Sequence, residues 1–360
     1  MKRSTTMNLR IEKTANPRQK PASDSLGFGN AFSDHMFMLD YTEGKGWHDA
    51  RIVPYGALPC EPSMMTFHYG QSIFEGLKAY RTATDEIVMF RPDQNMKRLN
   101  ESCDRLCIPR IDEAFCLDAM RQLVELDKDW IPDAKNTSLY IRPFIIATDP
   151  FLGVRPSDTY QFIIITGPVG AYYKEGLNPV RIWVESTYVR AVAGGIGQAK
   201  AAANYAASLK AQMVAKKNGF TQVLWLDGVE RRYIEEVGTM NVFFVIGDEV
   251  VTPSLNGSIL PGITRKSSID LLRSWGMQVS ERRLAIAEVY GAAANGTLKE
   301  AFGTGTAAVI SPIGELFWND QSITISDGKI GPVSQRLYDE MTGIQYKTLP
   351  DPFGWIYKVC

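Results

Sequence analysis

The stretch at residues 191–212, AVAGGIGQAKAAANYAASLKAQ, guides the interpretation of the whole chain. Between Ala191 and Ala206, Lys200 is the only charged side chain, and its neighbours are mostly alanine and glycine. Small neighbours let backbone or a flat ligand approach closely, and an apolar setting favours the neutral, nucleophilic amine. Lys200 is therefore either a surface lysine at the start of an alanine-rich helix or an amine able to form a Schiff base.

The composition is that of a soluble globular protein of two domains. The 360 residues are 45% hydrophobic and 22% charged, as in ordinary folded proteins. A net charge of -1 gives no support for nucleic-acid binding. No apolar run approaches the roughly 18 residues that cross a bilayer, and the five cysteines and three histidines show no disulfide or metal-site spacing. We expect a cytoplasmic protein that acts on small molecules, with no nucleic-acid, membrane or metal partner.

The basic N-terminal segment, residues 1–25, lacks the apolar core of a secretory signal. An organellar transit peptide would share its basic character, but the segment is short and contains Glu12. The ordinary alternative is an arm that is disordered or lies along the edge of a sheet.

Strand-like and helix-like segments are mixed in the first half of the chain. Residues 86–92, 138–148 and 160–170 are typical of strands, and residues 95–107 and 115–132 of amphipathic helices. Glycine, proline and asparagine in residues 167–179 indicate a linker. The sequence therefore predicts a small N-terminal α/β domain at 1–168, a linker at 169–180 and a larger domain at 181–360.

The second half continues the α/β (α+β) pattern. Residues 180–190 form a predicted strand, and the helix after Lys200 is expected to end at Gly219. A D-G pair at Asp227 and a G-D pair at Gly247 each predict a hairpin between strands. A further helix is expected after Pro261, with its apolar residues on one face.

Three segments could each contribute to a phosphate site. Pro261 and Gly262 precede a predicted helix, where the Ile263 and Thr264 amides can face an anion. Thr306 lies in a Gly/Thr-rich bend, and Arg91 stands between a strand and a helix. Each also has an ordinary explanation: a helix start, a tight turn or a surface salt bridge.

Two adjacent acids, Glu235 and Glu236, precede a Gly-Thr-Met-Asn bend and a very apolar strand. Because side chains alternate along a strand, we expect one of the two to face inward. An inward carboxylate suits the ring nitrogen of a pyridine cofactor. The alternative is a solvated hairpin in which both acids pair with Arg231 and Arg232.

Several motifs together resemble the branched-chain amino acid aminotransferases, which are pyridoxal-phosphate enzymes of fold type IV. The resemblance spans nearly the whole chain. It implies a two-domain fold and transamination between leucine, isoleucine or valine and 2-oxoglutarate, which gives glutamate by a ping-pong cycle. The motifs, in order, are FGNAFSDHMF, FHYGQSIFEGLKAY, FRPDQNMKRL, LYIRPF, FLGV, NYAASLKAQ, EEVGTMNVFF, LPGITR and FGTGTAAVISP.

The resemblance also implies roles for the residues that bind pyridoxal 5'-phosphate. Lys200 would form the Schiff base and act as general base and acid, and Tyr205 would hydrogen-bond the phenolic oxygen. Glu236 would pair with the pyridine nitrogen, leaving Glu235 as its outward neighbour. The remaining cofactor contacts would be Leu260 against the ring and a phosphate site made by Arg91, Ile263, Thr264 and Thr306.

A substrate pocket and a quaternary structure follow from the same resemblance. The Thr306 and Ala307 amides would receive the substrate α-carboxylate, and the protein is expected to be a homodimer. Arg142 and the tyrosine hydroxyls would receive the distal carboxylate of glutamate or 2-oxoglutarate. The pocket wall would be made by Phe28, Tyr69, Tyr140, Arg142 and Val154.

Two departures from the family pattern and two rival functions remain. Some members carry a Cys-x-x-Cys pair where this chain has Ala308 and Ser311, so that redox switch is expected to be absent. The usual GGNY is AANY here, with Ala202 and Ala203. One alternative function is another fold-type-IV activity, on D-amino acids, amines or aminodeoxychorismate; the motifs LYIRPF and EEVGTMN argue against it. The other alternative is a protein that binds the cofactor without turnover; the retained pocket wall argues against that.

Overall fold

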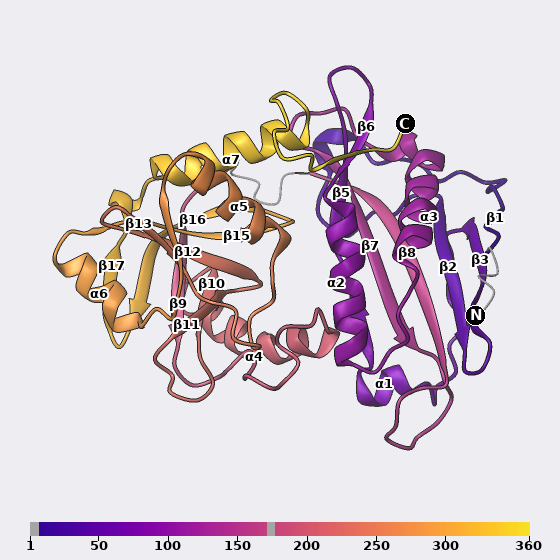
Figure 1. The fold of residues 1–360 in the computed structure, drawn as a ribbon, viewed down its shortest axis with the longest axis horizontal. Coiled ribbons are helices and arrows are strands. Elements are labelled where there is room, and N and C mark those ends of the chain that lie inside the picture. Colours follow the sequence, from indigo (N-terminus) through magenta and orange to yellow (C-terminus); the bar gives the residue numbers. More distant parts are fainter. Residues whose placement is uncertain (1–6, 171–176) are drawn as a thin grey trace. The chain divides into compact units, whose positions relative to one another are not determined.

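The computed structural model describes residues 7–170 and 177–360 and divides into two compact units, each built around its own sheet (Figure 1). The predicted α/β class is confirmed. The first unit comprises Met1–Tyr172, Ala199–Ala202 and Ile344–Cys360. The second comprises Tyr173–Gln198 and Ala203–Gly343.

The end of the chain differs from the expected division. Half of the linker expected at 169–180, residues 171–176, lies outside the described residues. Residues 344–360, expected in the C-terminal domain, belong to the first unit, because β18 (Ile356–Lys358) pairs with β6 (Ile87–Phe90). A strand of three residues has too little periodicity to reveal its partner in the sequence.

The first unit is built on a nine-stranded sheet with strand order β1-β3-β2-β8-β7-β5-β6-β18, and β4 also pairs with β7. Only β1 and β3 are parallel neighbours among its described pairs. Its other elements are β1 (Arg10–Ile11), β2 (His35–Thr42), β3 (Gly46–Pro54), α1 (Met65–Tyr69), β4 (Ser72–Phe74), β5 (Leu77–Arg81), α2 (Pro92–Arg105), α3 (Glu113–Leu126), β7 (Ser138–Ala147), β8 (Thr159–Val169), and the 3-10 turns Ser23–Ser25 and Lys128–Trp130.

Strand β7 shows how this sheet sorts its side chains. Leu139, Ile141 and Ile145 are fully buried in the hydrophobic core, whereas Tyr140 and Arg142 are only partly buried. This alternation follows from the two-residue period of a strand. It directs the two polar side chains to the face of β7 that is opposite the core residues.

Helices α2 and α3 cover the core face of the first sheet, as Figure 1 shows. Met96, Leu99 and Cys103 recur at helical spacing and are fully buried, as the sequence predicts. Helix α3 begins after Asp112, whose side chain accepts a hydrogen bond from the Phe115 N–H at 3.0 Å. That contact satisfies one of the backbone donors left open at a helix start.

The second sheet closes on itself. Its order is β11-β10-β9-β16-β15-β12-β13-β14, and the additional β11–β12 pairing joins six of these strands into a ring. Its elements are β9 (Val180–Glu185), α4 (Ala202–Lys217), β10 (Gln222–Leu226), β11 (Ile234–Val237), β12 (Met240–Ile246), β13 (Glu249–Thr252), α5 (Ile263–Ser274), β14 (Gln278–Glu281), α6 (Ile286–Ala294), β15 (Leu298–Gly305), β16 (Val309–Trp318), β17 (Gln321–Thr324), the 3-10 turn Ser326–Gly328, and α7 (Pro332–Gln345).

The two faces of this second sheet have separate cores. Ile182 and Val184 of β9 belong to the larger cluster of the unit. Between them, Trp183 packs instead with a cluster that includes Trp225 and Ala211 of α4. Because both faces are covered, side chains of either orientation along these strands are removed from water.

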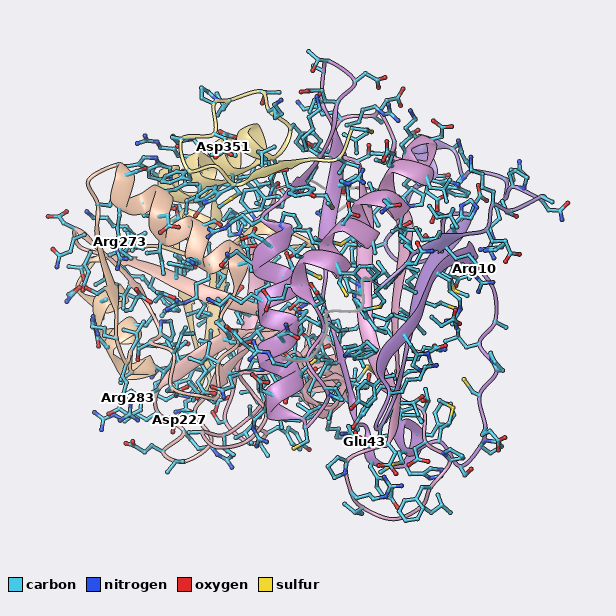
Figure 2. All side chains as sticks on the ribbon, turned by 45° about the vertical axis from the view of Figure 1, so that its right-hand side comes forward. Arg10, Glu43, Asp227, Arg273, Arg283 and Asp351 are labelled. Carbon is cyan, nitrogen blue, oxygen red and sulfur yellow. The ribbon has the colours of Figure 1, made fainter. Side chains whose placement is uncertain are left out.

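The two predicted hairpins differ in their turns. Gly247 has a φ of 58° in the short connection between β12 and β13, as the G-D pair predicts. The connection after Asp227 is longer than the D-G pair suggests, since β11 begins only at Ile234. The Asp227 carboxylate, labelled in Figure 2, organises this loop by accepting hydrogen bonds from four backbone N–H groups.

The N-terminal arm lies along a sheet edge where it is described. Residues Arg10–Ile11 form β1 and pair in parallel with Arg51 and Ile52 of β3. Residues 1–6 lie outside the described residues. Across the two described ranges, none of the helices is both long and apolar enough to cross a membrane.

Candidate active site

Lys200 is held by its backbone on both sides. Its N–H donates to the Ser102 hydroxyl of α2 at 3.0 Å, and its carbonyl accepts from the Phe74 N–H at 3.0 Å. The next residue, Ala201, forms an antiparallel bridge with Ile73. The Lys200 amine lies 4.8 Å from the centroid of the Phe74 ring. The lysine therefore sits in a fixed backbone position within the first unit rather than on an open helix surface.

A buried carboxylate lies near this lysine. Glu75 is 0% exposed and accepts hydrogen bonds at 2.8 Å from both Nε and Nη2 of Arg98, and at 2.7 Å from Asn95. Burial raises the pKa of Glu75, but the charges of Arg98 and Lys200 and these hydrogen bonds outweigh that effect, so the pKa lies below its usual value. Glu75 thus remains a negative charge close to the amine.

Arg91 occupies the predicted junction between strand and helix. It follows β6, precedes α2 and has a left-handed backbone with φ 49°. Its N–H donates to the Trp355 carbonyl at 2.8 Å, and its guanidinium carbon lies 5.0 Å from the Trp355 ring centroid. Trp355 in turn stacks on Phe353 at 4.2 Å. The C-terminal segment therefore fixes a side chain that the sequence assigned to phosphate binding.

Part of the predicted substrate wall is assembled around Phe74. The Arg142 guanidinium carbon lies 4.6 Å from the Phe74 ring centroid, and its Nη2 donates to the Tyr140 hydroxyl at 3.0 Å. Phe28 packs edge-on against Tyr140, with ring centroids 4.9 Å apart. Since the Lys200 amine contacts the same Phe74 ring, the amine and this wall meet at one aromatic side chain.

Gly76 is required by the position of Tyr140. A Cβ atom at residue 76 would lie 2.1 Å from the Tyr140 hydroxyl oxygen. Only glycine therefore allows the tyrosine hydroxyl to approach the backbone at this point. The motif FEGLKAY combines in three consecutive residues the aromatic ring, the buried acid and this small residue.

Tyr69 and Val154 are not brought to Phe74. Tyr69 is 41% exposed and Val154 is 85% exposed. The Tyr69 hydroxyl donates to the carbonyl of Leu152, which joins α1 to the loop that carries Val154. Among the described contacts, none connects these two side chains with Tyr140 or Arg142.

In the second unit, Glu236 is buried and has charged and backbone partners. It is 3% exposed, and its Oε1 accepts from the Leu260 N–H at 2.8 Å and lies 3.2 Å from Arg190 Nη2. The Leu260 carbonyl accepts from the Asn241 side chain at 2.9 Å. Both predicted residues, Glu236 and Leu260, are therefore in direct contact through the Leu260 peptide.

The expectation that Glu235 faces outward is wrong. Glu235 is also 3% exposed, and its Oε1 accepts hydrogen bonds from the Ser258 hydroxyl and from the Asn256 side chain. All four residues of β11 are buried. Alternation along a strand sorts side chains between two faces, but the segment that contains Asn256 and Ser258 covers the second face as well. The solvated hairpin with Arg231 and Arg232 is excluded for the same reason.

The start of α5 has the features expected of an anion site. The helix begins at Ile263, its N-cap is Gly262, and no side chain caps it. The first turn contains no acidic residue. A Cβ atom at residue 262 would lie 2.0 Å from Asn241 Oδ1, so the backbone approaches that side chain closely. The Ile263 and Thr264 amides are thus at a helix terminus without a competing carboxylate.

Thr306 and Ala307 lie in the turn between β15 and β16, as predicted. The register pairs Gly305 with Val309 across this turn. Val309 has a φ of 62°, which is rare for a β-branched residue and indicates a turn that its surroundings hold in place. Tyr205 lies in the first turn of α4 and is partly buried.

Four residues that lie beside the predicted site residues were not predicted: Phe74, Glu75, Trp355 and Arg190. The first two fall in the quoted motif FHYGQSIFEGLKAY but carried no assigned role. Trp355 and Arg190 lie far along the chain from Arg91 and Glu236. Nothing in the local pattern of a single sequence identifies such long-range partners.

Comparison with known proteins agrees with these features. The aminotransferase class IV family matches residues 72–316. The branched-chain-amino-acid aminotransferase 2 of Bacillus subtilis (strain 168) is 59% identical over 355 residues, which cover 99% of this chain and 98% of that protein.

Solved structures show the same architecture. The Escherichia coli branched-chain amino acid aminotransferase has a TM-score of 0.76 and 29% identity, and covers 90% of this chain and 99% of its own. The branched-chain aminotransferase of the archaeon Thermoproteus uzoniensis, solved with norvaline, has a TM-score of 0.74 and 25% identity, covering 91% and 100%. The chain belongs to the branched-chain-amino-acid aminotransferase family, within aminotransferase class IV.

Proposed function

We propose that this protein catalyses pyridoxal-phosphate-dependent transamination between branched-chain L-amino acids (leucine, isoleucine and valine) and 2-oxoglutarate. Branched-chain 2-oxo acids and L-glutamate would be formed in a ping-pong cycle. The observation that carries the proposal is the setting of Lys200: its backbone is fixed on both sides and its amine contacts Phe74, which also contacts Arg142.

The described residues fit the cofactor. Phosphate suits the uncapped start of α5, and a buried carboxylate suits the ring nitrogen. We propose that Glu236 pairs with the nitrogen, that Tyr205 hydrogen-bonds the phenolic oxygen and that Leu260 packs on the ring. Phosphate would be held by Arg91, the Ile263 and Thr264 amides, and Thr306.

When bound, the cofactor supplies the carbonyl group that accepts the substrate amine and the ring that takes up negative charge from the substrate α-carbon. The Lys200 amine would hold the cofactor and, once released from it, would act as the general base and acid that moves the substrate α-proton. Its backbone is held by Ser102 and Phe74, which limits the region that the amine can reach. The Phe74 ring limits access of water from one side of the amine.

Substrate selection follows from the Phe74 cluster, which we define as Phe28, Phe74, Tyr140 and Arg142. Its aromatic rings accept a branched aliphatic side chain. The Arg142 guanidinium and the Tyr140 hydroxyl can receive the distal carboxylate of glutamate or 2-oxoglutarate. The α-carboxylate would bind the Thr306 and Ala307 amides.

A homodimer and a cytoplasmic location complete the proposal. Exposed apolar side chains gather on α1 and the loop after β7, which the Tyr69–Leu152 hydrogen bond joins. Apolar groups concentrated in this way are typical of a protein interface. We propose that this surface, including the predicted pocket residues Tyr69 and Val154, faces the partner subunit. The exposed residues are Phe67, Tyr69, Phe151, Leu152 and Val154.

The test combines spectroscopy with chemical mapping. The purified protein is loaded with pyridoxal phosphate, and its visible absorbance is followed after L-leucine and then after 2-oxoglutarate. The proposal expects leucine to bleach the band and 2-oxoglutarate to restore it. Borohydride reduction of the loaded protein should place the cofactor on the peptide that contains Lys200, and Lys200→Ala should abolish both results.

Other outcomes would contradict defined parts of the proposal. Attachment at a different lysine would remove the assigned role of Lys200. A band that only D-amino acids bleach would leave the fold and the cofactor but replace the substrate class. A band that no amino acid bleaches would indicate cofactor binding without transamination.

A further inference from the structure

Arg190 is a buried arginine that no motif singles out. It is 9% exposed and lies after the end of β9. Its Nη2 is 3.2 Å from Glu236 Oε1 and donates at 3.2 Å to the Gly197 carbonyl and also to the Ser258 carbonyl. Burying a guanidinium is unfavourable unless charged and polar partners compensate for the lost water.

These three acceptors belong to three different segments of the second unit. Gly197 precedes Lys200 by three residues in the chain, Glu236 lies on β11, and Ser258 lies before α5. Arg190 therefore connects the proposed partner of the ring nitrogen with the two loops that lead to Lys200 and to the α5 start. A lysine ammonium is compact and lacks the planar fork of a guanidinium, so it reproduces the charge but not the same geometry.

The backbone is packed to permit this contact. A Cβ atom at Gly197 would lie 2.1 Å from the Ser258 carbonyl oxygen and 2.6 Å from the Ala191 Cβ. The two loops thus approach so closely that only a hydrogen atom fits on residue 197. This approach brings both carbonyls within reach of one guanidinium nitrogen.

The contacts of Glu236 with its partners are directional. The Leu260 N–H and Arg190 Nη2 both reach the same oxygen, Oε1. Two partners on one carboxylate oxygen fix the position of that oxygen. Arg190 also supplies the positive charge that a buried carboxylate requires.

We propose that Arg190 is a positioning residue for Glu236: together with the Leu260 N–H it anchors Oε1, so that the carboxylate is presented to the ring nitrogen of the cofactor. This inference rests on the proposed function, which assigns Glu236 to that nitrogen. Arg190 touches neither cofactor nor substrate in this proposal and acts only through Glu236.

The test is a double-mutant cycle on cofactor affinity. Full-length protein is freed of cofactor and titrated with pyridoxal phosphate, with Arg190→Met, Glu236→Gln and the double variant measured beside the wild type. We expect Arg190→Met to weaken binding about tenfold or more in the wild-type background and less than about twofold in the Glu236→Gln background. Arg190→Lys keeps the charge and should recover part of the loss.

The matched control is Glu235→Gln, which alters the neighbouring buried acid of the same strand. In that background Arg190→Met should cost as much affinity as in the wild type. If Arg190→Met does not fold, the cycle is run with Arg190→Lys. Equal losses in the wild-type and Glu236→Gln backgrounds would overturn the inference, because Arg190 would then act on its loops and not through Glu236.

Failure of the proposed function has a different signature. If the wild-type protein takes up no pyridoxal phosphate on Lys200, the proposed function is contradicted by the wild type alone, independently of the double-mutant cycle. If the wild type binds normally and Glu236→Gln has the same affinity as the wild type, the role of Glu236 and this inference fail together, while attachment at Lys200 stands.

Discussion

Each unit contains a buried glutamate paired with a buried arginine, and the two pairs are built differently. In the first unit, Arg98 donates hydrogen bonds to both carboxylate oxygens of Glu75, and Asn95 donates a further one. In the second unit, a single nitrogen of Arg190, Nη2, contacts Glu236 and also the carbonyls of Gly197 and Ser258. A guanidinium that binds both oxygens of one carboxylate is suited to stabilise the fold, whereas a guanidinium nitrogen that is shared with two backbone carbonyls is suited to orient the carboxylate between them.

The largest expected effect is on stability, from breaking the first pair. Arg98→Met leaves Glu75 at 0% exposure without its charged partner. We expect the free energy of unfolding to fall by about 3–5 kcal/mol, measured by urea unfolding of the apoprotein. Replacing both partners, as Glu75→Met with Arg98→Met, should recover most of that loss, because no charge is then left buried. Equal losses of unfolding free energy in the single and double variants would show that the unpaired charge of Glu75 is not the cause of the destabilisation.

The next largest effect is expected on turnover, from removing the charge of Glu236 in the second pair. Glu236→Gln keeps an oxygen for the Leu260 N–H but removes the charge assigned to the ring nitrogen. We expect kcat for leucine to fall roughly 100-fold, since a fixed charge that stabilises the transition state is lost. The free energy of unfolding should fall by about 1–3 kcal/mol, less than for Arg98→Met, because Arg190 loses its charged partner but keeps the Gly197 and Ser258 carbonyls as acceptors. A kcat close to that of the wild type would show that the charge of Glu236 does not support turnover, which contradicts the role given to the second pair.

The contrast also shows what could be predicted from the sequence and what could not. Lys200, Arg91 and the α5 start could be proposed as site candidates from the sequence because their signals are local: an isolated charge, a strand end, a Pro-Gly pair. Arg190 and Trp355 were not, because their partners are set by closure of the second sheet and by pairing of β18 with β6.

The error at Glu235 has a related cause. The alternation rule assigns one of two neighbouring residues to the outside, but it assumes that the outside is water. Here the segment with Asn256 and Ser258 covers that face. Coverage by an irregular segment leaves no periodic signal, so the rule correctly predicted that Glu236 is buried and was wrong about its neighbour.

A smaller and graded effect is expected from the pH dependence of the first pair. The pKa of Glu75 lies below its usual value, because Arg98 and Lys200 outweigh the effect of burial. Its contribution to stability is therefore fully present above the pKa of the unfolded chain, near 4.5, and is lost as the pH falls through the folded value. The wild-type free energy of unfolding, minus that of the Glu75→Met, Arg98→Met double variant, should decline on acidification by at most about 1.4 kcal/mol per pH unit. A difference that stays constant from pH 6 to pH 3.5 would contradict this account.

The smallest effect is expected at the acid next to Glu236. Glu235 uses Oε1 for Ser258 and Asn256, and its Oε2 is buried without a hydrogen-bond partner among the described residues. Glu235→Gln keeps the first oxygen and replaces the second by an amide nitrogen that is equally unsatisfied. Removing a buried charge favours the folded state, whereas leaving a buried amide N–H without an acceptor disfavours it. Because the two effects oppose each other, the free energy of unfolding should change by less than about 1 kcal/mol. Cofactor affinity and kcat should stay within about threefold of the wild type, because the nitrogen partner and Arg190 are untouched. If Glu235→Gln instead lost as much kcat as Glu236→Gln, the two neighbouring acids would share the role assigned here to one, and anchoring by Arg190 would not be what distinguishes them.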